Sequence, residues 1–333
     1  MALYGGTMRD LANDRAPASQ EGSDGALRAA SIEAVLKDEL ARSDRALSGV
    51  TPVLSHLLAG EGHSLVSDAI VARLRGMLFD LARQLAFASF DSADPFRDEE
   101  VDRFADQLSG DSAVLSHCYA IAMEGHLIER LEQRSMVDPV LSPLLQELIA
   151  SEKPAVGELA MSAMVAQSRF VQNQRRMQLP LAELPAELFG AVIRSWDKHC
   201  ERLELLQRAT ASQELKHSYD EGATRVGLLS RLISAMRGGS AAALNLEHAG
   251  FALFVTSLGM QTKQPRELAV LACHERQAAR LALSLRAAGL DANAIEQQFL
   301  LIEPEEGLPV GIGDIAAHDA QAMLSRSNAS AAG

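Results

Sequence analysis

The sequence predicts an all-α protein, an array of antiparallel helix pairs packed either as a HEAT-like irregular solenoid or as a helical bundle. Hydrophobic residues make up 47% of the chain but aromatic residues only 4%, so most of the apolar content is alanine and leucine. Alanine and leucine favour helices, whereas strands favour β-branched and aromatic side chains. Apolar residues also recur at steps of three and four, and short turn signals separate successive helical segments.

An N-terminal helical domain is expected over residues 25–211, after a flexible tail over residues 1–24 that is rich in Gly, Ser, Asp and Ala without periodicity. Capping signals such as Asp94-Pro95 and Asp138-Pro139 mark helix starts, because aspartate accepts free amide hydrogens and proline fits the first turn. The predicted helices of this domain span about residues 26–48, 52–59, 67–89, 96–108, 112–134, 138–150, 154–176 and 186–211.

A C-terminal helical domain is expected over residues 212–303, with helices at about residues 213–236, 244–259, 266–288 and 291–302. Glycines end the first and third of these helices, since glycine readily adopts the left-handed conformation that closes a helix. Residues 304–333 are predicted to be mostly irregular, with at most one short helix near residues 314–324. No fixed repeat length emerges, so the HEAT-like arrangement is suggested only by helix length and pairing.

Charge and cysteine usage restrict the compartment and the partners. The formal net charge of -13 repels phosphate backbones and anionic lipid head groups, so we expect neither nucleic acid nor membrane as a partner. Cys118, Cys200 and Cys273 form no disulfide framework. The chain start lacks a signal-peptide pattern, and the longest uncharged apolar stretch, residues 249–262, is shorter than the roughly 20 residues that cross a bilayer. The expected location is cytoplasmic.

Each cysteine has a histidine neighbour, but the spacing does not suit a metal. The pairs are His117–Cys118, His199–Cys200 and Cys273–His274. Adjacent residues on a helix point about 100° apart, and structural zinc sites use other spacings. We therefore expect no metal and no cofactor, and interpret these pairs as buried cysteines beside partly exposed histidines.

No catalytic motif occurs in the context that it requires, so no catalytic residue is predicted. Residues 311–316 match the dinucleotide pattern G-x-G-x-x-A, but no strand precedes them and no βαβ unit follows. The tripeptide that begins at His274 resembles the phosphoacceptor box of a histidine-kinase dimerisation helix, although no glycine-rich nucleotide loop accompanies it. His274 is therefore a phosphoacceptor candidate only for an alternative function.

The most distinctive stretch covers residues 167–189, QSRFVQNQRRMQLPLAELPAELF, in which basic residues precede a Leu/Pro segment. Its charged residues form the candidate protein-binding set: Arg169, Arg175, Arg176, Glu183 and Glu187. In one interpretation the cations stabilise a helix C-terminus and the leucines fill the core through a connection. In the other, the arginines bind a carboxylate or phosphate of a partner. The sequence leaves both open.

Two stretches carry a family resemblance: AMSAMVAQSRFVQNQRRMQLPLAELPAELF and HAGFALFVTSLGMQTKQPRELAVLACHERQAARLALSLRAAGL. With them the chain resembles the alphaproteobacterial family called domain of unknown function 2336, over about residues 45–303. The resemblance implies a helical, HEAT-like cytoplasmic protein from a bacterium. It implies no activity and no catalytic residues.

The sequence favours a non-enzymatic adaptor or regulator that binds another protein, because an Ala/Leu helical array without site chemistry is typical of scaffolds. One alternative is a phosphotransfer or two-component accessory protein that uses His274. The other is an enzyme whose site is assembled from scattered residues. A homodimer is compatible with all three hypotheses.

Overall fold

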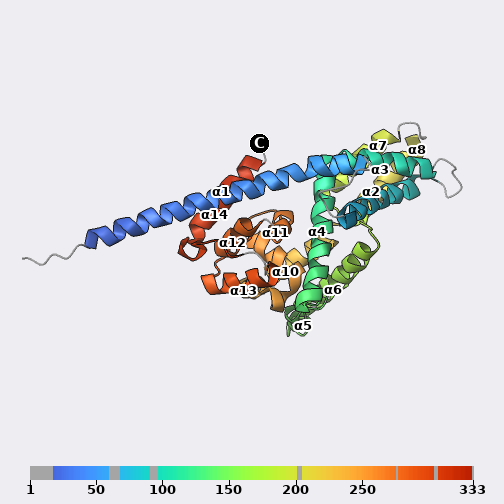
Figure 1. Ribbon diagram of the computed structural model, residues 1–333. Coiled ribbons are helices and arrows are strands. Elements are labelled where there is room, and N and C mark those ends of the chain that lie inside the picture. Colours follow the sequence, from blue (N-terminus) through green and yellow to red (C-terminus); the bar gives the residue numbers. More distant parts are fainter. Residues whose placement is uncertain are drawn as a thin grey trace, which may run out of the picture.

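The computed structural model describes residues 18–59, 68–90, 97–200, 205–274, 277–303 and 307–331, and this part of the chain is all-α (Figure 1). It contains α-helices and short 3-10 helices but no strand, which confirms the predicted fold class. Most of the predicted N-terminal tail lies outside the described residues, and residues 18–24 belong to the first helix.

The helices alternate with short connections along the whole chain. In the first half they are α1 (Ala18–Ala59), α2 (Asp68–Ser89), α3 (Arg97–Ser109), α4 (Ser112–Ser135), α5 (Pro143–Ile149), α6 (Pro154–Arg175), η1 (Leu181–Glu183) and α7 (Ala186–His199). In the second half they are α8 (Leu205–Ser218), η2 (Glu221–Ala223), α9 (Arg225–Met236), η3 (Arg237–Leu244), α10 (Leu246–Thr262), α11 (Arg266–Ala272), α12 (Ala278–Ala287), α13 (Ala292–Ile302), η4 (Ile312–Asp314) and α14 (Ala317–Ala331).

Several helices start at the side-chain caps that elementary chemistry requires. Asp111 accepts the amide hydrogens of Ala113 and Val114 and so begins α4. Asp138 makes the same kind of contact with Val140 and Leu141, at 2.8 and 2.7 Å, but it closes a turn and no helix follows it directly. The helix predicted over residues 138–150 is therefore shorter in the structure, because α5 begins at Pro143, directly after its cap residue Ser142.

Several further helices differ from the predicted boundaries. The helix predicted over residues 213–236 is divided, because α8 ends at Ser218 and α9 begins at Arg225, and the helix predicted over residues 186–211 ends at His199. The helix α1 continues through Pro52, where a turn was expected, and Leu54 beyond that proline is fully buried. The predicted helix over residues 266–288 is broken between α11 and α12. The C-terminal stretch expected to be mostly irregular contains the 15-residue helix α14, whose Met323 and Leu324 are buried. For α1 and α14, burial against other helices outweighs the local signals.

The helix α10 lies at the centre of the helices formed by the second half of the chain, and its residues 249–259 are all buried. It contacts α5, α9, α11 and α12. Gly250 has a φ of 71°, and a Cβ there would stand 2.9 Å from the Cβ of Ser142, so glycine permits both the kink and the close approach to the start of α5. This places α10 directly behind the helices that carry the site described below.

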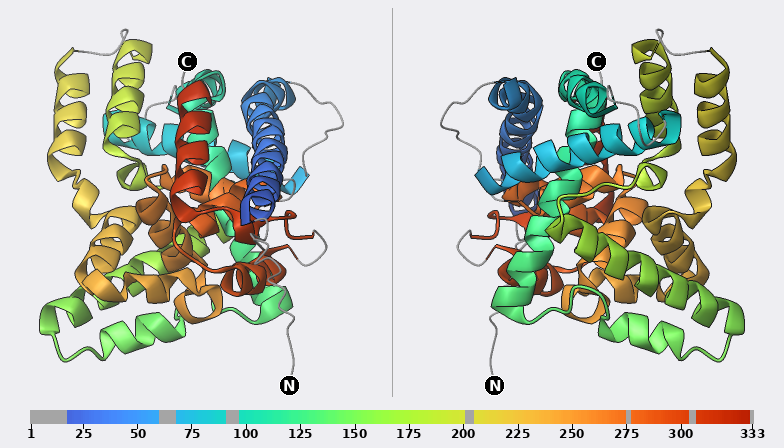
Figure 2. Two further views of the ribbon diagram at one scale, coloured as in Figure 1. Left: turned by 90° about the vertical axis from the view of Figure 1, so that its left-hand side faces the viewer. Right: turned by 90° about the vertical axis from the view of Figure 1, so that its right-hand side faces the viewer.

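The outer helices flank this centre. The first turns of α1 extend beyond the other helices, and α1 packs on α12 and α14 (Figure 1). The helices α7 and α8 stand side by side at one edge (Figure 2). A continuous hydrophobic cluster runs from Leu36 to Leu324, across the predicted domain boundary near residue 211. None of the helices in the described ranges combines the length and apolar content that a bilayer crossing requires.

Candidate functional site

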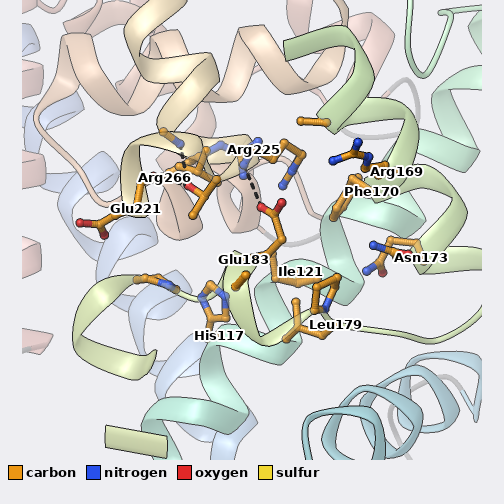
Figure 3. A pocket seen from close by; sticks show the side chains of 18 of the residues that line it. His117, Ile121, Arg169, Phe170, Asn173, Leu179, Glu183, Glu221, Arg225 and Arg266 are labelled. Carbon is orange, nitrogen blue, oxygen red and sulfur yellow. Dashed lines mark hydrogen bonds between the residues drawn. The ribbon is translucent and has the colours of Figure 1, made fainter. Parts of the chain in front are cut away.

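A pocket of about 550 Å³ lies where α4, α6, α9 and α11 meet the connection that follows α6 (Figure 3). Its volume falls within the range of roughly 300–1,000 Å³ that small-molecule sites occupy. Its walls combine apolar side chains, among them Ile121, Phe170 and Val226, with charged groups from four separate parts of the chain. We call this cavity the interior pocket.

Two of the arginines that line the interior pocket share a buried carboxylate, which does not itself line the pocket. Glu124 of α4 is 0% exposed, and its two oxygens accept hydrogen bonds from Arg225 of α9 at 2.7 and 2.8 Å. The same oxygens accept two further bonds from Arg266 of α11, at 2.7 and 2.6 Å. We call these three residues the Arg–Glu–Arg triad. It holds two positive charges and one negative charge, so its own net charge is positive.

Neighbouring polar groups hold the two guanidinium groups in place. Arg225 lies over the Phe170 ring, with 3.6 Å between its Cζ and the ring centroid, and also donates to the Oε1 of Gln167 at 3.0 Å. The Nε of Arg266 donates to the Oγ1 of Thr256 on α10 at 2.9 Å. The triad and its partners therefore join α4, α6, α9, α10 and α11.

Both arginines of the triad occupy the first residue of a helix, which brings them to the same side of α4. Arg225 follows the cap residue Thr224, whose Oγ1 accepts the amide of Gly227 at 3.0 Å. The Oε2 of Glu183 accepts the backbone amide hydrogen of Arg225 at 2.8 Å, and a carboxylate is favourable at a helix N-terminus. Arg266 follows Pro265 at the start of α11.

Glu124 and Arg266 remain ionised under ordinary conditions. Burial alone would raise the pKa of Glu124, but the adjacent charges of Arg225 and Arg266 and their hydrogen bonds outweigh it and hold that pKa well below its usual range. For Arg266, burial acts to lower the pKa and Glu124 overcomes it, so the pKa of this guanidinium is raised. The charges of Glu124 and Arg266 are therefore fixed.

A histidine with one unused nitrogen also lines the interior pocket. The Nδ1 of His117 lies 3.4 Å from the Oε1 of Glu267, and this hydrogen bond lowers the pKa of Glu267. His117 is only 7% exposed, and its Nε2 has no hydrogen-bond partner. Both residues also line a second cavity, of about 480 Å³. The expectation of a partly exposed His117 was therefore wrong, because α11 covers this face of α4.

The candidate protein-binding set is divided by the structure. Arg169 and Glu183 both line the interior pocket, which joins them to the triad. Arg175 and Arg176 are exposed at the end of α6, and Glu187 is exposed in the first turn of α7. None of these three is among the pocket-lining residues.

The burial expected in the first interpretation of residues 167–189 is found for its apolar residues, whereas binding of a partner by its arginines stays a prediction. The leucines of the connection after α6 are buried (Leu179, Leu181 and Leu184), as is Phe189 in the first turn of α7. The three arginines make no side-chain hydrogen bond or ion pair with the described residues. The segment is a core connection through its leucines and a charged surface through its arginines.

The other sequence candidates lie outside the interior pocket. His274 is half-buried in the turn after α11, so it is not on the face of a long helix. Cys118, Cys200 and Cys273 are buried, as expected, and burial raises the pKa of Cys118 to about 12. The described part of the chain contains no group of three side chains placed to hold a metal ion.

None of the triad residues was predicted from the sequence. One signal existed, because Glu124 is the single acidic residue within the apolar run over residues 118–128, and an ionised group in a buried helix needs a partner. Nothing local identifies that partner, since Arg225 and Arg266 are 101 and 142 residues away along the chain.

Comparison with protein-family models, with curated proteins and with solved structures found no match. The resemblance to the domain of unknown function 2336 family therefore stays a prediction. Function rests on the chemistry of the site itself.

Proposed function

We propose that the protein is a non-enzymatic helical regulator that binds a small carboxylate-bearing organic molecule in the interior pocket. The observation that carries this proposal is the presence of three guanidinium groups in the wall of a preformed cavity. Arg225 and Arg266 share a single buried carboxylate, and Arg169 adds a third guanidinium to the wall.

Hydrogen-bonding capacity remains on these guanidinium groups. Each terminal nitrogen of arginine carries two hydrogens. The Nη1 and Nη2 of Arg266 each donate one hydrogen bond to Glu124, which leaves a second hydrogen on each nitrogen. The guanidinium of Arg169 has no acceptor among the described residues. Arginine is well suited to carboxylates because its planar fork of donors matches the two oxygens.

The apolar part of the wall suits the body of an organic ligand. Ile121, Phe170 and Val226 line the same cavity as the arginines. Small-molecule sites typically combine an apolar lining with a few placed polar groups that orient the ligand. A molecule with one carboxylate and an apolar body matches this combination.

The fixed charges favour binding over proton-transfer chemistry. General acid–base catalysis works best with a group whose pKa lies near the operating pH. Among the lining residues, the pKa of Glu267 is lowered and that of Arg266 is raised, and the pKa of Glu124 behind the arginines is lowered as well. These groups present constant charges to a ligand, which supports a recognition role.

Ligand binding can be tested by thermal shift and titration calorimetry with aliphatic and aromatic carboxylates, and with inorganic phosphate for comparison. We expect the carboxylates to bind and Arg169→Ala to weaken their affinity about tenfold or more, since hydrogen bonds to charged groups contribute about 1.5–3 kcal/mol. The control is Arg175→Ala, which removes an exposed arginine outside the pocket wall. Absence of binding, or equal effects of the two variants, would contradict the proposal.

A protein adaptor is a second candidate, and the exposed arginine pair at the end of α6 favours it. Arg175 and Arg176 are exposed without a partner among the described residues, on a chain whose net charge is -13. Pull-down from a bacterial lysate should enrich an acidic partner with the wild type and lose it with Arg175→Glu/Arg176→Glu. Lys153→Glu, at the exposed opposite end of α6, should leave the capture unchanged.

A further inference from the structure

Groups that accept hydrogen bonds line the interior pocket together with the arginines. Figure 3 shows Arg225 and Arg266 facing His117 and Leu179 across the cavity, with the carboxylate of Glu183 between them. The Oε2 of Glu183 accepts the amide of Arg225, while its Oε1 has no donor among the described residues. The pocket therefore presents a free acceptor close to its cationic wall.

The unused nitrogen of His117 is also an acceptor when the ring is neutral. A carboxylate only accepts hydrogen bonds, so the hydrogen between His117 and Glu267 belongs to the Nδ1 of the histidine. A neutral imidazole carries one hydrogen, which leaves its Nε2 with a lone pair. This Nε2 is buried and has no donor. A ligand that supplies an N–H group would satisfy it.

The charges of the pocket wall also balance. Arg169, Arg225 and Arg266 line it with three positive charges, and Glu183, Glu221 and Glu267 line it with three negative charges. A ligand with a net negative charge would therefore place its carboxylate near Glu183 without compensation. A ligand with no net charge, but with separated charges, matches both the guanidinium groups and the acceptors.

We propose that the ligand is an amino acid or a comparably small zwitterion, an inference that rests on the proposed function of the interior pocket. Its carboxylate binds Arg169 and Arg266, and its ammonium group donates to Glu183 and to the Nε2 of His117. Its apolar side chain lies against Ile121 and Phe170. The ammonium group distinguishes this ligand from a simple organic acid.

The test uses the full chain and the standard L-amino acids in a thermal-shift screen, followed by calorimetry on the tightest ligand. That amino acid is compared with its analogue without the amino group and its analogue without the carboxylate; for leucine these are isocaproate and isoamylamine. We expect the amino acid to bind about tenfold or more tightly than either analogue, because each analogue loses one charged contact.

Glu183→Gln separates the ammonium contact from the carboxylate contact. Glutamine retains an oxygen for the amide of Arg225 but removes the negative charge. It should weaken amino-acid binding about tenfold, whereas binding of the desamino analogue should not weaken, because its carboxylate no longer lies near a negative charge. Glu187→Gln, an exposed residue outside the pocket wall, should change neither.

The outcomes distinguish this inference from the proposed function. If the desamino acid binds as tightly as the amino acid, or if Glu183→Gln has no effect, the zwitterion assignment is wrong and the carboxylate-binding function stands. If neither amino acids nor simple carboxylates bind, both are wrong.

Discussion

Replacing Glu124 with glutamine should destabilise the protein more than almost any other isosteric change. The carboxylate accepts four hydrogen bonds from two guanidinium groups, at 2.6–2.8 Å, and is fully buried. Glutamine fills the same space, so no cavity forms. It removes the only charge that compensates Arg225 and Arg266 within the triad, and its amide hydrogens face other donors.

The expected loss follows from the cost of leaving a buried charge without its partner, which is about 3–5 kcal/mol. An unfolding entropy of about 2.1 cal/mol/K per residue over 333 residues gives about 0.7 kcal/mol/K. The melting temperature should therefore fall by about 4–7 °C. A loss of about 3–5 kcal/mol is a large part of the roughly 5–15 kcal/mol of unfolding free energy that stabilises a typical domain.

Urea unfolding provides the measurement, followed both by helical circular dichroism and by the fluorescence of Trp196. This residue is the only tryptophan and is 1% exposed in α7, so its emission reports loss of the core. Coincident transitions from the two probes would support a two-state analysis. The matched control is Glu158→Gln on the exposed face of α6, which should change the unfolding free energy by less than about 0.5 kcal/mol.

The pH dependence gives an independent check of the same argument. The pKa of Glu124 is lower in the folded protein than its ordinary value of 4.5. The stabilisation from its ionised form is therefore complete above that value and is lost as the pH falls through the folded pKa. The stability difference between wild type and Glu124→Gln should be constant near neutral pH and shrink below about pH 4.5. A loss under about 1 kcal/mol at neutral pH, or a difference that grows in acid, would refute the reasoning.

Two further substitutions test the packing. Gly125→Ala should lower the unfolding free energy measured in urea by about 1–3 kcal/mol, because a Cβ there would stand 2.9 Å from the Oε1 of the buried Gln174. The control is Gly49→Ala, where a Cβ would have no atom within 4 Å, and it should be neutral or stabilise α1 by up to about 1 kcal/mol. Equal effects of the two substitutions would contradict this prediction. Arg280→Met should loosen α14, because the buried Arg280 joins Asp44 of α1 to the C-terminal helix. In the variant, hydrogen exchange over residues 317–331 should be faster than in the wild type, while exchange in α6 should not change. Unchanged protection of α14 would show that apolar packing alone holds this helix.

Part of the candidate site was visible in the sequence. Arg169 and Glu183 stand out by charge in an unusual Leu/Pro context, and both line the interior pocket. Arg175 and Arg176 belong to the same stretch but lie outside the pocket wall, because α6 ends there and the chain turns inward at Leu179. Sequence context thus identified the segment that contributes to the interior pocket. Only the structure distinguished the residues of this segment that line the pocket from those that lie outside it.

The sequence by itself determined the fold class and the approximate positions of most helices. Helix formation depends on propensity and on apolar spacing within one or two turns, and both are local properties of this Ala/Leu-rich chain. Local signals also predicted the start of α4 at Ser112 and the burial of the cysteines.

Only the tertiary structure decided which charges meet. Glu124 pairs with residues more than 100 positions away, and no periodicity extends over such a distance. The break between α11 and α12, the helical C-terminus and the buried His117 depend likewise on which helix covers which face. The physical reason is that a helix needs only its neighbours in sequence, whereas a buried ion pair needs two segments that the packed core brings together.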